Sequence, residues 1–249
     1  MRNLLLTIRY CGTRYSGWQV QANAPTVQQT LQDAVERLFQ VRENVTGCSR
    51  TDAGVHANMY CCNIRTASAL PCRTVVSGLN AYLPDDIAVL ACEEVDYDFH
   101  ARYDCTGKEY RYLIRNSAIR DPFLIDRCWL FKPKLDAALM HEQAQDFVGE
   151  HDFSAFCAAG ASTVNNVRTV TDCSVERHGD EITFSVAANG FLYNMVRIMV
   201  GTLTDISLGK IPPGTIPQII ASRDRERAGV TAPAQGLTLN RVFYRSEKE

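Results

Sequence analysis

The sequence predicts an α+β protein built from two ferredoxin-like (split βαβ) halves, and three observations lead to this prediction. Hydrophobic periodicity and turn residues in the first 100 residues indicate the order strand, helix, strand, strand, helix, strand. The second half of the 249-residue chain resembles the first in element type, with more insertions. The helices are few and amphipathic beside many strands, which favours an antiparallel sheet with helices packed on one face. The other face of such a sheet is free to bind an extended or helical polymer.

The first half is expected to begin with a buried strand over 4–10, followed by a helix with a well-marked start. Thr26 is a typical N-cap, Gln29 completes a capping box, and apolar residues repeat at helical spacing from Val27 to Leu38. The remaining elements of this half are a strand over 45–48, a strand over 58–65, a helix over 73–82 that Pro84 ends, and a strand over 87–95.

The second half is expected to contain one long helix that starts near Asn194 and ends at Gly209, a residue type suited to the position after a helix. The boundary between the halves lies near residue 105, which gives predicted domains of 1–104 and 105–249. The other expected elements of this half are a strand over 108–116, a helix over 135–148, a hairpin with strands over 167–177 and 181–188, and a final strand over 237–244.

The composition excludes several classes of protein. Apolar residues make up 46% and charged residues 22% of the chain, which is ordinary for a globular protein. No run approaches the roughly 18 apolar residues of a membrane span, and the N-terminal apolar run is too short for a signal peptide. We therefore expect a cytoplasmic protein with no membrane partner.

The ten cysteines form no CxxC pair, so zinc ribbons and thioredoxin-type sites have no support. In the cytoplasm, reduced thiols are the expected state. Cys61, Cys92 and Cys173 lie in apolar, strand-like runs, where we expect them to pack as small hydrophobic residues.

The formal net charge of −2 gives no overall basic field of the kind that marks many nucleic-acid binders. The distribution of charge is more informative, because 21 of the 26 basic residues are Arg. Eight basic and four acidic residues lie between Arg102 and Lys134. Arg makes planar, bidentate contacts with phosphate, which suits RNA. Taken alone, the bias is explained more simply by genome composition or ordinary surface usage.

The segment Arg50-Thr51-Asp52-Ala53-Gly54-Val55-His56-Ala57 carries the first candidate for chemistry. An Asp among small or polar residues with Gly nearby is typical of a turn, from which its carboxylate projects into a cleft. For a lone pattern of this kind, a turn cap in which Asp52 accepts a local backbone N–H is the simpler interpretation. His56 is a candidate base, although a single His is more often structural.

This octapeptide, together with six other segments, resembles the TruA family of tRNA pseudouridine synthases. The octapeptide is highly specific, whereas the other segments are individually weak and jointly strong, and the similarity covers essentially the whole chain. The other segments are Gly17-Trp18-Gln19, Lys108-Glu109-Tyr110-Arg111-Tyr112, His151-Asp152-Phe153, Val167-Arg168-Thr169, Phe191-Leu192-Tyr193-Asn194-Met195-Val196-Arg197 and Ala232-Pro233.

The resemblance implies a fold, an activity and site residues. Family members convert uridine to pseudouridine at positions 38, 39 and 40 of the tRNA anticodon stem-loop. The implied pseudouridine synthase fold has two related halves that share a continuous sheet with a central cleft. The resemblance also implies a homodimer that needs no cofactor or metal. The essential Asp of the family falls on Asp52, the base-contacting Tyr on Tyr110, the Asp-pairing Arg on Arg197 and the base-displacing Arg on Arg50.

The chemistry of this reaction explains why one carboxylate suffices. The N1–C1′ glycosidic bond breaks, the uracil turns, and a C5–C1′ bond forms, with no net oxidation, reduction or hydrolysis. A carboxylate can attack C1′, remove a ribose proton to give a glycal, or add to C6 of the ring. The residues leave the three routes open, and we favour the glycal route.

Asp52 has to stay ionised in a fairly dry pocket, where burial alone favours its neutral form. A paired Arg197 offsets that cost; the alternative is an Arg that extends from the helix surface into solvent. Flipping the target uridine leaves a gap in the base stack, which Arg50 can fill, since strand residues two apart share a face. Tyr110 is expected to stack on the uracil and to help remove the C5 proton. The alternative for Tyr110 and Tyr112 is ordinary packing in a sheet.

RNA recognition is expected to rely on shape and phosphate contacts. The candidates for contact with the RNA backbone are Arg14, Arg102, Lys108, Arg111, Arg115 and Arg168. Three rival functions remain: a pseudouridine synthase that acts on another RNA such as rRNA, a non-catalytic RNA-binding module, and an aspartate hydrolase of small substrates. The carboxylate of Asp52 argues against the RNA-binding module, because a protein that only binds phosphate does not need it. Against the hydrolase stands the lack of a second placed carboxylate.

Overall fold

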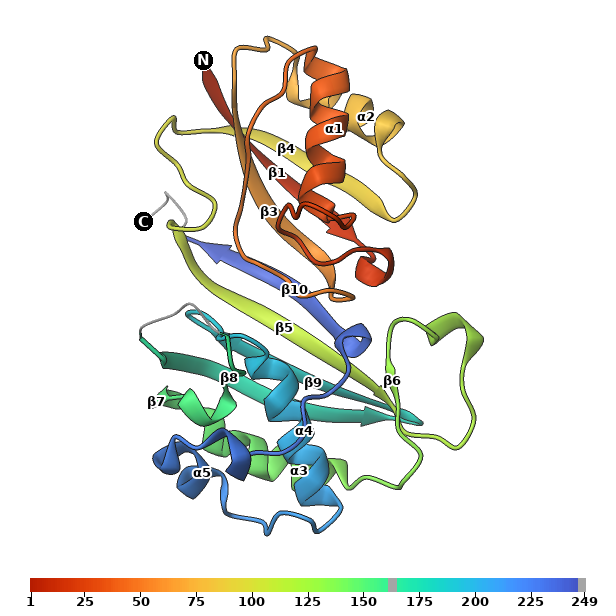
Figure 1. The fold of residues 1–249 in the computed structure, drawn as a ribbon, viewed down its shortest axis with the longest axis vertical. Helices are drawn as coiled ribbons and strands as arrows, with labels where there is room; N and C mark the ends of the chain where they lie inside the picture. The colour runs from red at the N-terminus through yellow and green to blue at the C-terminus, as the bar shows by residue number, and fades with distance from the viewer. Residues whose placement is uncertain (161–164, 246–249) are drawn as a thin grey trace. The chain divides into compact units, whose positions relative to one another are not determined.

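The computed structural model describes residues 1–160 and 165–245, and its contacts divide the chain into two compact units (Figure 1). Unit 1 contains residues 1–106 and the chain from Thr238 onward, and unit 2 contains residues 107–237. The predicted second domain extends to the C-terminus, whereas the last strand, β10 (Leu237–Tyr244), lies almost wholly in unit 1. The reason is that β10 pairs with β3 (His56–Thr66) of that unit.

Unit 1 has the predicted order of elements. They are β1 (Arg2–Tyr10), α1 (Val27–Phe39), β2 (Val45–Gly47), β3, α2 (Cys72–Tyr82) and β4 (Ile87–Val95). β1 pairs with β3 and β4, and β2 pairs with the other edge of β3, all antiparallel. The resulting strand order, β4-β1-β3-β2, is that of a split βαβ unit. β10 joins the same edge of β3 as β2 and runs parallel to β3.

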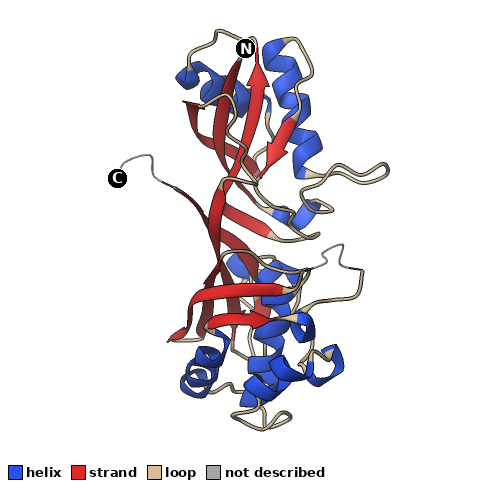
Figure 2. Ribbon diagram, turned by 90° about the vertical axis from the view of Figure 1, so that its left-hand side faces the viewer, coloured by secondary structure: helices blue, strands red, loops and turns tan. Residues whose placement is uncertain are grey.

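The two helices of unit 1 pack on one face of its sheet (Figure 2). α1 begins where Thr26 Oγ1 accepts a hydrogen bond from the Gln29 N–H at 3.3 Å. The predicted capping box forms only by this half, because the Gln29 side chain donates to Asp33 at 2.7 Å instead. Val27 and Leu31 of its apolar stripe are fully buried.

Unit 2 holds a second α+β layer, and among its described residues the strand pairs are antiparallel except for one. Its elements are β5 (Cys105–Arg115), β6 (Trp129–Leu130), α3 (Ala137–Ala144), β7 (Gly149–Asp152), β8 (Val167–His178), β9 (Glu181–Ala188), α4 (Met195–Ser207) and α5 (Ile216–Ser222). β9 lies between β5 and β8, β7 follows β8, and β6 runs parallel to β5. The β3–β10 and β5–β6 pairs therefore make the pairing mixed, where a wholly antiparallel pattern is predicted.

Most predicted elements of unit 2 are present with small changes of length. The predicted helix over 135–148 ends earlier, at Ala144, and continues as a 3₁₀ turn over Gln145–Phe147. β6, β7 and α5 were not predicted, because two to seven residues are too few for a periodic signal. α4 ends as expected, with Gly209 at a φ of 71°.

All ten cysteines are free. Cys61 and Cys173 are buried as expected, while Cys92 is half-buried. Burial raises the pKa of the Cys61 thiol to about 11, so this thiol is protonated at neutral pH. No helix in residues 1–160 or 165–245 is long and apolar enough to cross a membrane.

Two buried asparagines fix the segment that follows β4. Asn3 is fully buried, and its amide donates to the carbonyls of Asp96 at 3.0 Å and Phe99 at 2.9 Å. Asn63 donates to the Asn3 side-chain oxygen at 3.0 Å and accepts from the Ala101 N–H at 3.0 Å. Buried polar groups of this kind stabilise one conformation only while each of them has a partner.

We expect Asn63→Ala to lower the free energy of unfolding by roughly 2 kcal/mol, because it leaves the Ala101 N–H without its buried acceptor. Asn58→Ala is the matched control on the same strand, since Asn58 is exposed and its side-chain amide donates to Asn240 Oδ1 at 3.0 Å outside the buried network. Urea unfolding followed by circular dichroism measures both losses. Equal losses in the two variants would contradict the structural role of Asn63.

Candidate active site

The loop between β2 and β3, residues 48–55, presents Arg50 and Asp52. Thr51 lies between them and is buried, Asp52 is half-buried and Arg50 is exposed. The Thr51 carbonyl accepts from the Trp18 N–H at 3.1 Å, and its hydroxyl shares a 2.8 Å hydrogen bond with Tyr10. The buried side chain of Thr51 thus anchors the loop that carries its two neighbours.

A turn closes the loop directly after Asp52. The Asp52 carbonyl accepts from the Val55 N–H at 3.1 Å, and Gly54 has a φ of 79° that favours glycine. The backbone of Asp52 therefore belongs to a turn, as predicted.

Gly17 explains why the segment around Trp18 belongs with this loop. Its φ is 91°, and a Cβ placed there would collide with the Thr51 carbonyl oxygen. Only glycine allows this close approach, so the Gly17-Trp18 segment seats the backbone that carries Asp52.

His56 has a structural role in this loop. It is buried, and its Nδ1 accepts the Gly12 N–H at 3.0 Å. This hydrogen bond uses one ring nitrogen to connect the backbone just after β1 to the start of β3. The geometry therefore favours a structural role for His56 over that of a catalytic base.

In unit 2, the backbone around α4 fixes the direction of Arg197. Its Nε donates to the Ala232 carbonyl at 2.7 Å, and its Nη1 donates to Asn194 Oδ1 at 2.7 Å. The Ala232 N–H donates in return to the Arg197 carbonyl at 3.1 Å. Arg197 is half-buried, so its guanidinium is held in one orientation, unlike an Arg that extends into solvent.

The tyrosines of β5 point inward, and Arg111 between them is exposed. The Tyr110 ring meets Phe191 edge-on, with ring centres 5.0 Å apart. The Tyr112 hydroxyl donates to the Pro233 carbonyl at 2.7 Å, and burial raises the pKa of this hydroxyl above its ordinary value. Segments 108–112, 191–197 and 232–233 thus converge within unit 2. Packing is the role that the structure supports for Tyr112.

The His151-Asp152-Phe153 segment forms a cap in unit 2. The Asp152 carboxylate accepts from the Ser154 N–H and from the Ser154 hydroxyl, and Arg223 pairs with it at 3.0 Å. The hydroxyl bond from Ser154 keeps the pKa of Asp152 below its ordinary value. Phe153 is fully buried, so this segment stabilises the unit.

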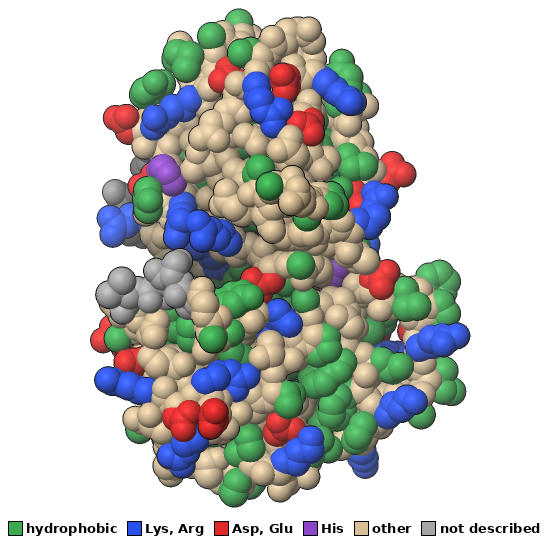
Figure 3. Space-filling model, viewed as in Figure 1, with side chains coloured by type: hydrophobic (Ala, Val, Ile, Leu, Met, Phe, Trp, Pro, Cys, Tyr) green, Lys and Arg blue, Asp and Glu red, His purple; other side chains and the backbone are tan. Residues whose placement is uncertain are grey.

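Four of the six candidates for RNA-backbone contact already have partners within the chain. Arg14 pairs with Asp86, Arg111 with Glu109, and Arg115 with Asp180, at distances that run from 2.6 to 3.3 Å. Arg168 donates to the carbonyls of Asn165 and Val167. Arg102 and Lys108 form no ion pair with another described residue. On the face in Figure 3, basic and acidic side chains are interspersed, in keeping with the net charge.

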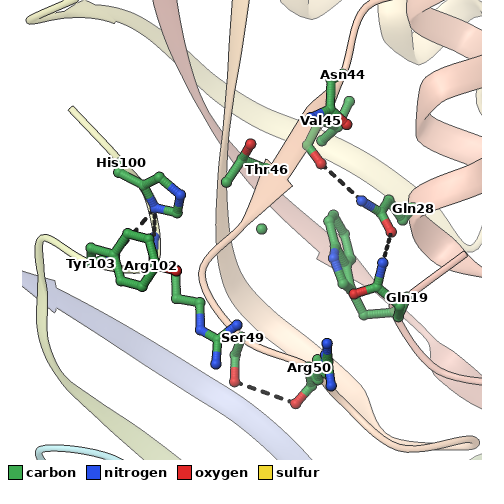
Figure 4. Close-up of a pocket in the computed structure, with 12 residues that line it drawn as sticks. Gln19, Gln28, Asn44, Val45, Thr46, Ser49, Arg50, His100, Arg102 and Tyr103 are labelled. Atoms are coloured by element: carbon green, nitrogen blue, oxygen red, sulfur yellow. Dashed lines mark hydrogen bonds between the residues drawn. The ribbon is translucent and has the colours of Figure 1, made fainter. Parts of the chain in front are cut away.

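A cavity of about 270 Å³ opens beside the Asp52 loop in unit 1 (Figure 4). Its lining includes Arg50, Arg102, His100 and Tyr103. His100 and Tyr103 were not predicted as site residues. The sequence His100-Ala101-Arg102-Tyr103, in which two aromatic rings flank an Arg, is the pattern from which these two residues could have been predicted. No cluster of three metal-ligating side chains occurs in the described parts of the chain.

Comparisons with known proteins identify the family to which the chain belongs. Residues 6–104 and 143–245 match a family model described as tRNA pseudouridine synthase. The chain is 50% identical to tRNA pseudouridine synthase A of Acetivibrio thermocellus over 98% of this chain and 100% of that protein. It is 44% identical, with the same coverage of both chains, to the protein of that name from a Thermoanaerobacter species. It is also 44% identical to tRNA pseudouridine synthase A 2 of Clostridium perfringens, again over 98% and 100%. The chain belongs to the tRNA pseudouridine synthase family.

Proposed function

We propose that this protein isomerises uridine to pseudouridine at positions 38, 39 and 40 of the tRNA anticodon stem-loop, with Asp52 as nucleophile or base. Family membership over both units supports the reaction. The observation that carries the assignment of Asp52 is its loop, in which a buried Thr51 and a close-packed Gly17 hold the backbone on both sides. A pure binding module has no use for a carboxylate held in this way.

Each further residue has a role that its geometry suits. Arg50 is exposed two residues before Asp52, so its side chain is free to enter the gap that the flipped uridine leaves. Tyr110 is held by Phe191 with its ring plane fixed, which suits stacking on uracil and removal of the C5 proton by its hydroxyl.

Arg197 pairs with Asp52 in this proposal and keeps the carboxylate ionised and oriented. Two hydrogen bonds, to the Ala232 carbonyl and to Asn194, support this pairing because they already orient the guanidinium. Binding of the carboxylate therefore needs little further ordering of the Arg197 side chain. Arg cannot release its proton at working pH, so the pair is stable through the reaction.

The protein works as a homodimer in the cytoplasm on this proposal, without cofactor or metal. Arg102 and Lys108 are the first choices for phosphate contact. Arg14, Arg111, Arg115 and Arg168 contribute to the field around the RNA from their present pairs.

Asp52→Asn is expected to abolish tritium release from tRNA labelled at uridine C5, because an amide is neither nucleophile nor base. Binding of the tRNA is retained, since the substitution keeps the shape of the side chain. Asp85→Asn is the control, because Asp85 is exposed outside the loop. No release by the unsubstituted protein with tRNA still bound would favour a binding module, and mapping of the modified sites tests for another RNA target.

Tyr110→Phe is expected to bind tRNA with unchanged affinity and to lose at least ~100-fold in turnover, the contribution of one acid–base group. The ring contact with Phe191 survives, so the fold does too. Single-turnover tritium release measures the effect, with Tyr82→Phe on the exposed end of α2 as the control. Full turnover in Tyr110→Phe would leave the hydroxyl without a role.

Arg197→Lys is expected to reduce turnover on the order of 100-fold, since an ammonium cannot bond Ala232 and Asn194 and also face a carboxylate in the same geometry. A weaker cationic partner raises the pKa of Asp52, so the acid limb of the rate profile moves to higher pH. Arg223→Lys, in an exposed pair with Asp152, is the control. An unchanged pH profile at full activity would rule out the pairing.

A further inference from the structure

The cavity beside the Asp52 loop has a composition that the proposed chemistry does not account for. It lies between residues 44–50 and residues 100–103, and both stretches belong to unit 1 (Figure 4). Its residues are polar, aromatic or cationic in the main, and none of the described lining residues is acidic. A site of this composition suits an anion that carries an aromatic ring.

One cation of the cavity is available for a phosphate. Arg102 is exposed, lines the cavity and forms no ion pair in residues 1–160 or 165–245. Figure 4 shows its side chain extending from the 100–103 stretch toward Ser49. A guanidinium in this position offers bidentate donors to a phosphodiester.

The aromatic part of the cavity is a close, tilted pair of rings. The ring centres of His100 and Tyr103 lie 4.2 Å apart, with 33° between the planes. Tyr103 is 77% exposed, so its ring remains accessible to a further aromatic group. Single-stranded RNA is commonly held in this way, by bases that stack on exposed aromatic side chains.

The backbone under this pair is fixed before any ligand arrives. His100 Nδ1 accepts from the Arg102 N–H at 3.1 Å and from the Tyr103 N–H at 3.3 Å. The Asp104 carboxylate accepts the His100 N–H at 2.7 Å. The side-chain oxygen of the buried Asn63 accepts the Ala101 N–H at 3.0 Å and fixes the backbone between the two rings. A preformed surface costs less ordering on binding than a mobile one.

The opposite side of the cavity offers a group for a base edge. Gln19 donates through its amide nitrogen to Gln28 at 3.2 Å. Gln28 in turn donates to the Val45 carbonyl at 2.9 Å, which fixes the pair. Trp18 beneath them is buried and stacked on Tyr60 with ring centres 4.1 Å apart. The amide oxygen of Gln19 is thereby placed to accept an N–H from a base.

We propose that this cavity binds one unpaired RNA nucleotide next to the target uridine, with its base on Tyr103 and its phosphate at Arg102. The inference rests on the proposed function, because Arg50 lines the cavity and lies two residues from Asp52. When the target flips toward Asp52, its neighbour loses a stacking partner. Tyr103 supplies a replacement surface on one side, and Arg50 enters the gap on the other.

The test is a cycle of protein and RNA changes, measured as the Kd of an anticodon stem-loop in an Asp52→Asn background that prevents turnover. Tyr103→Ala is expected to weaken binding about tenfold with intact RNA. With an RNA that is abasic at the nucleotide on one side of the target, the same change is expected to cost nothing, because the stacking partner is already missing. Arg102→Gln is expected to weaken binding of both RNAs, since the phosphate remains.

Tyr82→Ala and Arg73→Gln are the matched controls, because both side chains are exposed on α2 away from the cavity. Equal losses from Tyr103→Ala with intact RNA and with each abasic RNA, or no loss at all, would overturn the inference. Tritium release by the unsubstituted protein separates the two claims. If it is present while the cycle shows no coupling, only the nucleotide subsite fails; if it is absent, the proposed function fails first.

Discussion

The close packing of Gly17 against the Thr51 carbonyl is the constraint on which the candidate site in unit 1 depends. The loop that carries Asp52 has no regular hydrogen-bonded ladder of its own, so neighbouring backbone has to hold it. Trp18 supplies an N–H at 3.1 Å, Tyr10 binds the Thr51 hydroxyl, and Gly17 gives the room for both contacts. A side chain at Gly17 would push the loop outward and move Asp52 with it. On the proposed function, a displacement of about 1 Å costs on the order of 100-fold in rate, so this contact would control turnover without touching the substrate.

The Arg197 side chain in unit 2 is likewise positioned by contacts with backbone. A carbonyl at 2.7 Å and a side-chain amide oxygen at 2.7 Å hold two of its nitrogens. The Ala232-Pro233 segment that provides the carbonyl is also held through Pro233 by the Tyr112 hydroxyl. The positions of Tyr112, Pro233 and Arg197 are therefore linked. This linkage brings three segments that lie far apart in the sequence together at one place in unit 2.

Sequence reasoning predicted most of the fold, because long periodic segments carry their own signal. The strand over 87–95 and the strand over 237–244 have the same bounds in the structure. It failed where a contact that the periodic pattern does not show decides the outcome. Gln29 was expected to complete a capping box, but Asp33 lies one helical turn away and takes its amide. β10 was assigned to the second half by its place in the chain, whereas its pairing with β3 puts it in unit 1.

Some residues of the candidate site can be predicted from residue type alone, whereas others are recognised only from how the chain packs. Asp52 and Arg50 are readable from one specific octapeptide, and a turn at Gly54 follows from its composition. The tilted ring pair of His100 and Tyr103 cannot be predicted in this way, because the backbone on which it stands is held by Asn3 and Asn63, on strands far away in sequence. Two buried asparagines in a strand pair are a liability for the core unless every polar group is satisfied. Here they satisfy the backbone of one exposed segment, so a polar network inside the sheet determines the surface that the segment presents.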